Sequence, residues 1–522
     1  MKYRHTRLNE DGSLQELADA QEFAQNNHPD ARPNEDGSQQ NAIASSSELE
    51  SMVVSVAQSR EIGHALELHA ARSKRPDYRP DVDGLRAIAV VAVIIFHMDH
   101  RWLPGGFVGV DVFFVISGYV VSHTLIPQCL TRSTSVASLL LAFYARRCKR
   151  LAPALVAMVL VMSAAVSWAV PPEMDQLDKN YITAQFVLIG WANNHFASTF
   201  SSYWDEGMSS LEYNFFTHTW SLGVEEQFYF LFPALCVLAH REYHKLGFVL
   251  LLINTALLSL IISATLTAWN QRLAYYLLPS RFWQLMAGAI IYQTRTVRIA
   301  AEGSTSVSMR CLRCALLAIA QLLLCACFVV AFAFTPNDVG FPVPYSFAAI
   351  GGAMGFIVLG AAPGPPPLLT RLVGCAPMAY VGRLSYPLYL WHWPVFVFFK
   401  WITDFEPTGV RVAALFATII LSLATYHALE LNVQQWRPQR RSTVFLSAGL
   451  AVAATEMWLG ALRGPLYGSL YPQPASFLES FQPPPITTVL RPPLMPSPTS
   501  ALLPVHLPSP LPPSPSPPPP SP

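Results

Sequence analysis

Two histidines in apolar segments are the residues of this sequence best suited to catalysis. His97 follows Arg86 by eleven residues in one apolar run, and His392 lies in another. On a helix, eleven residues make about three turns and about 16 Å of rise, so Arg86 and His97 share one face. Ionisable side chains are costly in hydrocarbon and mark functional sites there. We predict Arg86 near the cytoplasmic surface, His97 near mid-membrane and His392 at a similar depth.

The chemistry that such histidines support is proton transfer. Imidazole is the usual general base near neutral pH, and a hydroxyl that attacks a thioester needs such a base. A single buried histidine is more often a hydrogen-bonded packing residue, so neither His97 nor His392 taken alone would indicate catalysis. Two of them at one depth favour catalysis.

A second candidate site lies in a basic segment, FYARRCKRLAP, at residues 143–153. Arg147 and Arg150 are one helical turn apart, and their planar guanidinium groups suit the 3'-phosphate and pyrophosphate of coenzyme A. Basic residues at the cytoplasmic membrane edge also arise from the positive-inside rule alone. Both interpretations remain open at this point.

Membrane helices must position these side chains. The chain has 522 residues, of which 52% are hydrophobic and 13% charged, against about 25% charged in soluble globular proteins. From Gly84 to Gly460, apolar runs near the length of ~20 residues that crosses a bilayer alternate with polar loops. We predict an all-α polytopic membrane bundle of ten to eleven transmembrane helices. The spans are 84–100, 107–126, 151–170, 224–240, 246–268, 275–293, 312–334, 345–362, 384–401, 410–430 and 444–463.

Composition divides the chain into four regions. Residues 1–75 are polar and are predicted to be a disordered tail. Residues 76–437 form the membrane domain, and residues 438–465 add one transmembrane helix. Residues 466–522 form a proline-rich, low-complexity tail, which favours polyproline II.

Basic residues predict the orientation of the bundle. They concentrate in alternate connecting segments, including 132–150 and 295–313, whereas the segment 335–344 contains none. The positive-inside rule then predicts a cytoplasmic N-terminus and a lumenal or extracellular C-terminus.

Some partners and groups are excluded. The net charge is +1 and the basic residues are dispersed, so nucleic acid is not an expected partner. Cys311 and Cys314 form a CxxC pair without a second pair at a zinc spacing. We expect no metal site and no permanently bound cofactor; the lipid bilayer is the expected surroundings.

Six motifs follow one another along the membrane domain. They are YRPDVDGLRAIAV at 78–90, GGFVGVDVFFVISGY at 105–119, RRCKRLAP at 146–153, TWSLGVEEQFY at 219–229, RFWQLMAG at 281–288 and LSYPLYLWHWP at 384–394. In this order they resemble the acyltransferase-3 family, which contains membrane O-acetylases of bacterial surface polysaccharides and peptidoglycan. The resemblance spans about residues 78–437.

The resemblance implies roles for the matching residues. Arg86 and His97 match the pattern of Arg, ten residues and His that is essential to catalysis along the acyl-donor path. Arg147 and Arg150 match an Arg-x-x-Arg pattern associated with the coenzyme.

The remaining motif positions include an acidic pair and two departures from the family pattern. Glu225 and Glu226 match an acidic pair that would orient the acceptor, although acidic residues also favour a helix N-terminus. At Gln284 the family usually has Glu, so a charge-dependent role is lost there. The family's motif ends in Glu-Pro-Arg, whereas this sequence has Glu430 and, farther along, Arg437.

These observations predict a membrane O-acyltransferase. It would move an acyl group, acetyl by the resemblance, from cytoplasmic acyl-CoA to a hydroxyl of a glycan on the outer side, with His97 as the base. A covalent acyl-histidine at His97 or His392 is a variant of this mechanism. The alternative is a polytopic transporter, because buried Arg and His also line transport paths.

Overall fold

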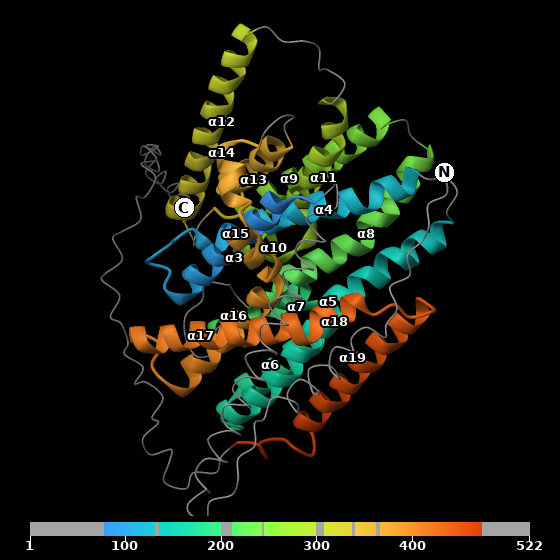
Figure 1. Ribbon diagram of the computed structural model, residues 1–522. Coiled ribbons are helices and arrows are strands. Elements are labelled where there is room, and N and C mark those ends of the chain that lie inside the picture. Colours follow the sequence, from blue (N-terminus) through green and yellow to red (C-terminus); the bar gives the residue numbers. More distant parts are fainter. Residues whose placement is uncertain are drawn as a thin grey trace, which may run out of the picture. The chain divides into compact units, whose positions relative to one another are not determined.

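The structure, a computed structural model, describes residues 78–130, 135–199, 211–242, 245–298, 307–336, 340–361 and 366–471. The predicted N-terminal tail, 1–75, lies outside the described residues, as do residues 472–522 of the predicted proline-rich tail. Within the described ranges every regular element is a helix (Figure 1), which confirms the all-α class.

Each of the eleven predicted spans overlies an observed helix. The long helices are α3 Pro80–Met98, α4 Gly109–Leu130, α5 Val136–Ala169, α8 Trp220–Glu242, α9 Lys245–Trp269, α11 Leu278–Arg298, α12 Val307–Phe334, α16 Ser385–Ile402, α17 Thr408–Ala424 and α19 Ser442–Arg463. The shorter ones are α6 Asp175–Leu188, α7 Ala192–Thr199, α10 Gln271–Tyr276, α13 Phe347–Gly360, α14 Leu368–Val373, α15 Ala376–Arg383 and α18 Leu431–Gln435. A π-helix, η5 Thr425–Glu430, joins α17 to α18, and the 3-10 turns are η1 Gly106–Val108, η2 Leu211–Tyr213 and η3 Thr217–Thr219.

The chain is a multi-pass membrane protein. Six helical segments of the described part are long and apolar enough to cross a bilayer. They are Gly106–Cys129, Val136–Ala169, Leu246–Trp269, Ala315–Phe334, Thr408–Gln435 and Ser442–Arg463. The helices α3, α8, α11 and α16 are of membrane length but fall outside this set. They carry Arg86, Glu225, Arg281 and His392, while Asp111, Arg147 and Arg150 are on α4 and α5, so both groups of helices contribute polar side chains to the interior.

The basic segment of residues 143–153 is part of a helix rather than of a loop. The expected span began at residue 151, whereas α5 begins at Val136 and continues for 34 residues. The side chain of Ser135 caps its N-terminus by accepting a hydrogen bond from the backbone N–H of Ser138, which satisfies a donor that the first turn leaves free. Arg147 and Arg150 are therefore on a rigid element.

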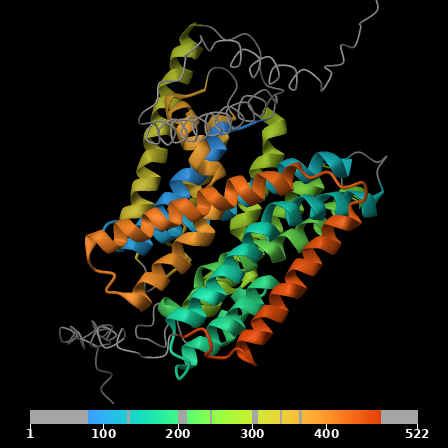
Figure 2. The same cartoon turned by 60° about the horizontal axis from the view of Figure 1, so that its bottom comes forward.

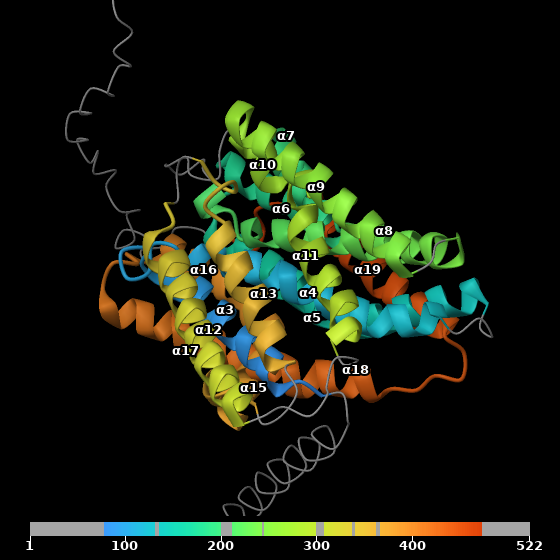
Figure 3. The same cartoon turned by 90° about the horizontal axis from the view of Figure 1, so that it is seen from above.

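Close helix contacts surround α4. In Figure 3, α11 lies between α4 and α9, and α11 contacts both. A Cβ atom at Gly118 of α4 would lie 1.8 Å from the carbonyl oxygen of Leu285, and one at Gly288 of α11 would lie 2.0 Å from that of Val115. Only glycine permits this approach of two backbones, which is a recurrent means of packing helices in membranes.

A buried polar network also joins α4 to α11. Arg281, which is fully buried, donates from Nη1 to Oδ1 of Asp111 at 3.0 Å. Gln284 donates to the same oxygen at 2.7 Å. An ionised carboxylate cannot donate a hydrogen bond. The amide of Gln284 therefore fits this network, whereas an ionised glutamate at position 284 would not.

The C-terminal helix packs on the outside of the bundle. Figures 1 and 2 both show α19 running beside α5, and α19 also contacts α6. Trp458 donates to Ser163 of α5 at 2.9 Å. Thus α19 is held mainly by α5 and α6.

Candidate functional site

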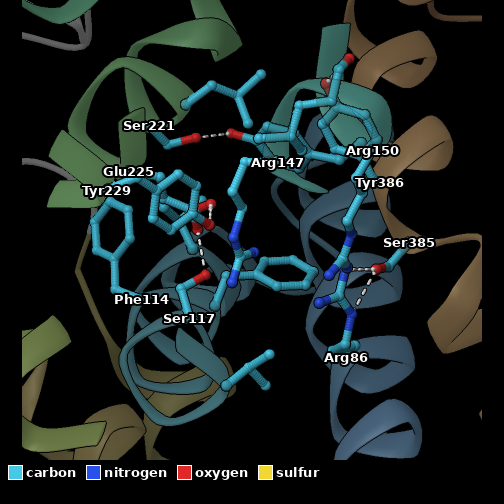
Figure 4. Close-up of a pocket in the computed structure, with 16 residues that line it drawn as sticks. Arg86, Phe114, Ser117, Arg147, Arg150, Ser221, Glu225, Tyr229, Ser385 and Tyr386 are labelled. Atoms are coloured by element: carbon cyan, nitrogen blue, oxygen red, sulfur yellow. Dashed lines mark hydrogen bonds between the residues drawn. The ribbon is translucent and has the colours of Figure 1, made fainter. Parts of the chain in front are cut away.

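A polar pocket opens between α3, α4, α5, α8 and α16 (Figure 4). Its walls combine three arginines and one carboxylate with hydroxyl groups and apolar side chains. The lining residues are Arg86, Val110, Phe113, Phe114, Ser117, Val120, Arg147, Arg150, Leu151, Ser221, Leu222, Glu225, Tyr229, Ser385, Tyr386 and Tyr389. We call it the arginine pocket.

Arg86 is fixed at the wall formed by α3 and α16. Its Nε and Nη2 atoms donate to Oγ of Ser385 at 3.0 and 2.8 Å, and Nε also faces the carbonyl oxygen of Gly382 at 3.2 Å. Its guanidinium carbon lies 5.9 Å from the ring centroid of Phe113. All three partners are uncharged, so the positive charge of Arg86 is not neutralised by them.

Arg147 enters the pocket from α5 together with Arg150, as their spacing of one turn predicts. The guanidinium carbon of Arg147 lies 4.7 Å from the ring centroid of Tyr229 and 5.4 Å from that of Phe143. Figure 4 shows Arg147 pointing into the middle of the pocket. None of the ion pairs found in the described residues includes Arg86, Arg147 or Arg150. Three cationic groups therefore face one cavity.

Glu225 lies in this same pocket. Its carboxylate accepts hydrogen bonds from Ser117 at 2.8 Å and from Tyr229 at 2.9 Å. Glu226 faces away, because its Oε2 atom would lie 2.1 Å from a Cβ at Gly190. Neighbouring helical residues differ by about 100° in direction, so the two glutamates that the sequence suggested as one acceptor-side pair are not at one site.

A histidine cluster lies beyond the arginine pocket. The ring centroids of His97 and His392 are 5.5 Å apart, and those of His392 and His218 are 5.6 Å apart. Trp393 packs against His97 with its ring centroid at 4.7 Å. Thus α3 and α16 bring together the two histidines that the sequence singled out. His97 is in the last turn of α3, which ends at Met98.

His392 is oriented by its own helix. It is fully buried, and its Nδ1 atom lies 2.7 Å from the carbonyl oxygen of Tyr389 and 3.2 Å from that of Leu388. A carbonyl only accepts, so Nδ1 carries the proton and Nε2 keeps its lone pair. Nε2 has no hydrogen-bond partner in the described structure. His392 thus presents a proton-accepting nitrogen in a buried site.

Comparison with known proteins identifies the group to which this architecture belongs. Residues 79–427 match the family described as "Acyltransferase domain". The chain is a member of the acyltransferase-3 family. The matched region contains the arginine pocket and the histidine cluster.

Curated relatives of this acyltransferase-3 protein occur in Staphylococcus aureus. "O-acetyltransferase OatA" of strain NCTC 8325 / PS 47 is 29% identical over 369 residues, which cover 69% of this chain and 58% of that protein. A second relative is SAS0844 of strain MSSA476, whose name also contains the term O-acetyltransferase. It is 26% identical over 388 residues, which cover 70% of this chain and 60% of that protein. The chain therefore spans less than two thirds of these relatives. No solved structure matches it significantly.

His218 is the member of the cluster that our sequence reasoning missed. It is buried in η3, directly before α8 of this acyltransferase-3 domain. The signal was available, because His218 precedes the TWSL motif at residues 219–222 by one position. His218 was overlooked because it lies in a connecting segment, where the spacing of residues along the sequence does not indicate how deep a side chain lies in the membrane.

A charged pair lies next to the cluster on the far side from the arginine pocket. Lys400 of α16 pairs with Glu212 of η2, and its Nζ atom lies 5.8 Å from the ring centroid of Trp393. The Lys400 ammonium lowers the pKa of the Glu212 carboxyl. The Glu212 carboxyl is therefore ionised at neutral pH.

The described residues of this acyltransferase-3 protein contain no group of three or more His, Cys, Asp or Glu side chains that could hold a metal ion. In the histidine cluster the ring of His392 lies against those of His97 and His218, and Trp393 packs against His97.

Proposed function

We propose that this protein is a membrane O-acyltransferase that moves an acyl group, acetyl in the simplest case, from acyl-CoA to a hydroxyl of a glycan. The arrangement that carries the proposal is an arginine pocket next to a buried histidine cluster. The donor enters from the cytoplasm and the acceptor from the lumenal or extracellular side. No cofactor is held permanently.

The charge of the pocket supports an anionic donor. Three guanidinium groups face it against one carboxylate, Glu225, which is already hydrogen-bonded by Ser117 and Tyr229. Arginine binds phosphate through planar, bidentate hydrogen bonds, and these charge-assisted bonds are stronger than neutral ones. Coenzyme A supplies a 3'-phosphate and a pyrophosphate for Arg147 and Arg150. Its pantetheine arm then extends past Arg86 toward the histidines.

The histidine cluster supports the chemical step. His97 removes the proton from the acceptor hydroxyl, whose oxygen attacks the thioester carbonyl. The C–S bond breaks, a C–O ester bond forms, and the proton passes from the imidazole to the thiolate, which leaves as free coenzyme A. The ring centroid of His392 lies 5.5 Å from that of His97, and its Nε2 atom has no hydrogen-bond partner. His392 can therefore accept a proton during the reaction.

The names of the relatives and the groups next to His97 support a glycan acceptor. Both names contain the term O-acetyltransferase, which indicates a hydroxyl acceptor. Lys400, Glu212 and Trp393 lie on the side of His97 away from the arginine pocket. A sugar suits the pair of Lys400 and Glu212 because its hydroxyls can form hydrogen bonds with charged side chains.

The direct test uses the purified full-length chain in lipid discs. Labelled acetyl-CoA and a panel of glycan acceptors are supplied to wild type and His97→Ala. We expect acylated glycan from wild type and a loss of about 10²- to 10⁴-fold in the variant, the usual contribution of a general base. Equal transfer by both proteins would remove His97 from the mechanism. No transfer to any acceptor by wild type would favour a transporter.

A further inference from the structure

Tyr389 lies on the boundary between the arginine pocket and the histidine cluster. It lines the pocket together with Phe113 and Ser221. Its ring centroid is 5.3 Å from that of His392, 5.5 Å from that of His218 and 6.2 Å from that of Phe113. The ring therefore has the pocket on one side and two imidazoles on the other.

The ring is held by hydrogen bonds at both ends of the residue. The phenol donates to the carbonyl oxygen of His218 at 2.9 Å, so it accepts from Oγ of Ser221, which is 2.8 Å away. The backbone carbonyl of Tyr389 lies 2.7 Å from Nδ1 of His392. The hydrogen bond to His392 thus uses the backbone of Tyr389 and not its phenol, whose ring lines the arginine pocket.

We propose that Tyr389 is the specificity-determining residue for the acyl group. This inference rests on the proposed function. The acyl carbon must come within reach of the cluster, so the acyl chain occupies the innermost part of the pocket. The rings of Tyr389 and Phe113 bound that space. A short acyl group fits beside them, whereas each further methylene collides with a ring that is held by two hydrogen bonds.

The proposal predicts opposite shifts for smaller and larger side chains. Tyr389→Leu makes room for added methylenes, and Tyr389→Trp removes room. One methylene in an apolar pocket changes discrimination by about 10- to 200-fold. We therefore expect the preference for acetyl-CoA over butanoyl-CoA to fall at least about tenfold in Tyr389→Leu. In Tyr389→Trp we expect the preference to rise.

The experiment measures release of the coenzyme A thiol from acetyl-CoA and butanoyl-CoA by the full-length chain in lipid discs, with the glycan panel as acceptor. Binding of unacylated coenzyme A is measured in parallel by calorimetry. It should change less than about threefold, because the arginines that hold coenzyme A do not hydrogen-bond to Tyr389. Val397→Ala is the matched control, since Val397 is buried on the same helix eight residues farther along. Its acetyl-to-butanoyl ratio should equal that of wild type.

The outcomes separate this inference from the proposed function. If wild type transfers acetyl and both variants bind coenzyme A with the wild-type acyl ratio, Tyr389 does not set specificity. If Tyr389→Leu does not fold, Tyr389→Trp alone decides, and an unchanged ratio there overturns the inference. If wild type cleaves no acyl-CoA, the proposed function itself fails and the inference fails with it.

Discussion

The arginine pocket and the histidine cluster lie next to each other but are built in opposite ways. In the pocket, cationic groups face a cavity and are held by neutral partners, such as Ser385 under Arg86. In the cluster, the ring of His392 lies between those of His97 and His218, and Trp393 packs against His97. Charges beside open space suit the binding of an anion. Imidazole rings close together suit the transfer of protons.

The difference shows how one bundle can separate binding from chemistry. Losing a pocket arginine should weaken donor binding, whereas losing a cluster histidine should slow the reaction on a donor that is still bound. Tyr389 contacts both regions. The three predictions below test this division.

The largest effect is expected for His392→Ala. Its imidazole is fully buried with Nε2 unpartnered, so its removal should lower kcat by about 10²- to 10⁴-fold. Binding of coenzyme A, measured by calorimetry, should stay within about threefold, since the arginines are untouched. His427→Ala is the matched control, because His427 is exposed and pairs with Tyr380 outside the cluster. A His392→Ala protein with weakened donor binding and unchanged kcat would contradict the division.

An intermediate effect is expected for Arg147→Ala. A hydrogen bond to a charged group contributes about 1.5–3 kcal/mol, so KM for acetyl-CoA should rise by about ten- to a hundredfold with kcat little changed. Arg147→Lys should restore binding only partly, because an ammonium lacks the planar fork. Arg146→Ala serves as control, since Arg146 is the exposed neighbour on α5. The KM values are obtained from initial rates at varied acetyl-CoA concentration. Equal KM values for all three variants would show that Arg147 is not part of the donor site.

The smallest effect is expected for Glu225→Gln. Removing the one carboxylate among three arginines raises the positive charge of the pocket, so the KM for acetyl-CoA should fall, by roughly two- to fivefold for a partly screened charge. The KM for the glycan should not move. Glu226→Gln, which alters a carboxylate that faces away, should change neither. A rise in the glycan KM for Glu225→Gln would instead support the acceptor-side role that the sequence first suggested.

Much of the fold was predictable because it depends on local composition. The eleven predicted spans all overlie helices, since apolar runs of bilayer length have few other solutions in hydrocarbon. The start of α5 was misjudged by fifteen residues because hydropathy alone decided it. The polar first half of this helix, with Arg147 and Arg150, is held by packing and by the Ser135 cap, which a hydropathy scan does not detect.

The site was only partly predictable because it depends on contacts between distant segments. Arg86, His97 and His392 were singled out because each is an ionisable residue of an apolar segment and their positions along these segments indicated their depth in the membrane. Glu225 was placed with Glu226 because adjacency in sequence hides the turn of about 100° between them. His218 was missed because no periodic pattern links a connecting segment to α16. Only the packed structure places its ring 5.6 Å from that of His392.

The length of α5 has a further consequence. Its 34 residues extend about 51 Å at 1.5 Å per residue, whereas the hydrocarbon core of a bilayer is about 30 Å thick. The helix is therefore longer than the core is thick, and part of it extends beyond the hydrocarbon. When a membrane thickens or thins, such a helix can respond by tilting. If coenzyme A binds in the arginine pocket as proposed, its affinity should accordingly be the same in discs made from short-chain and long-chain lipids.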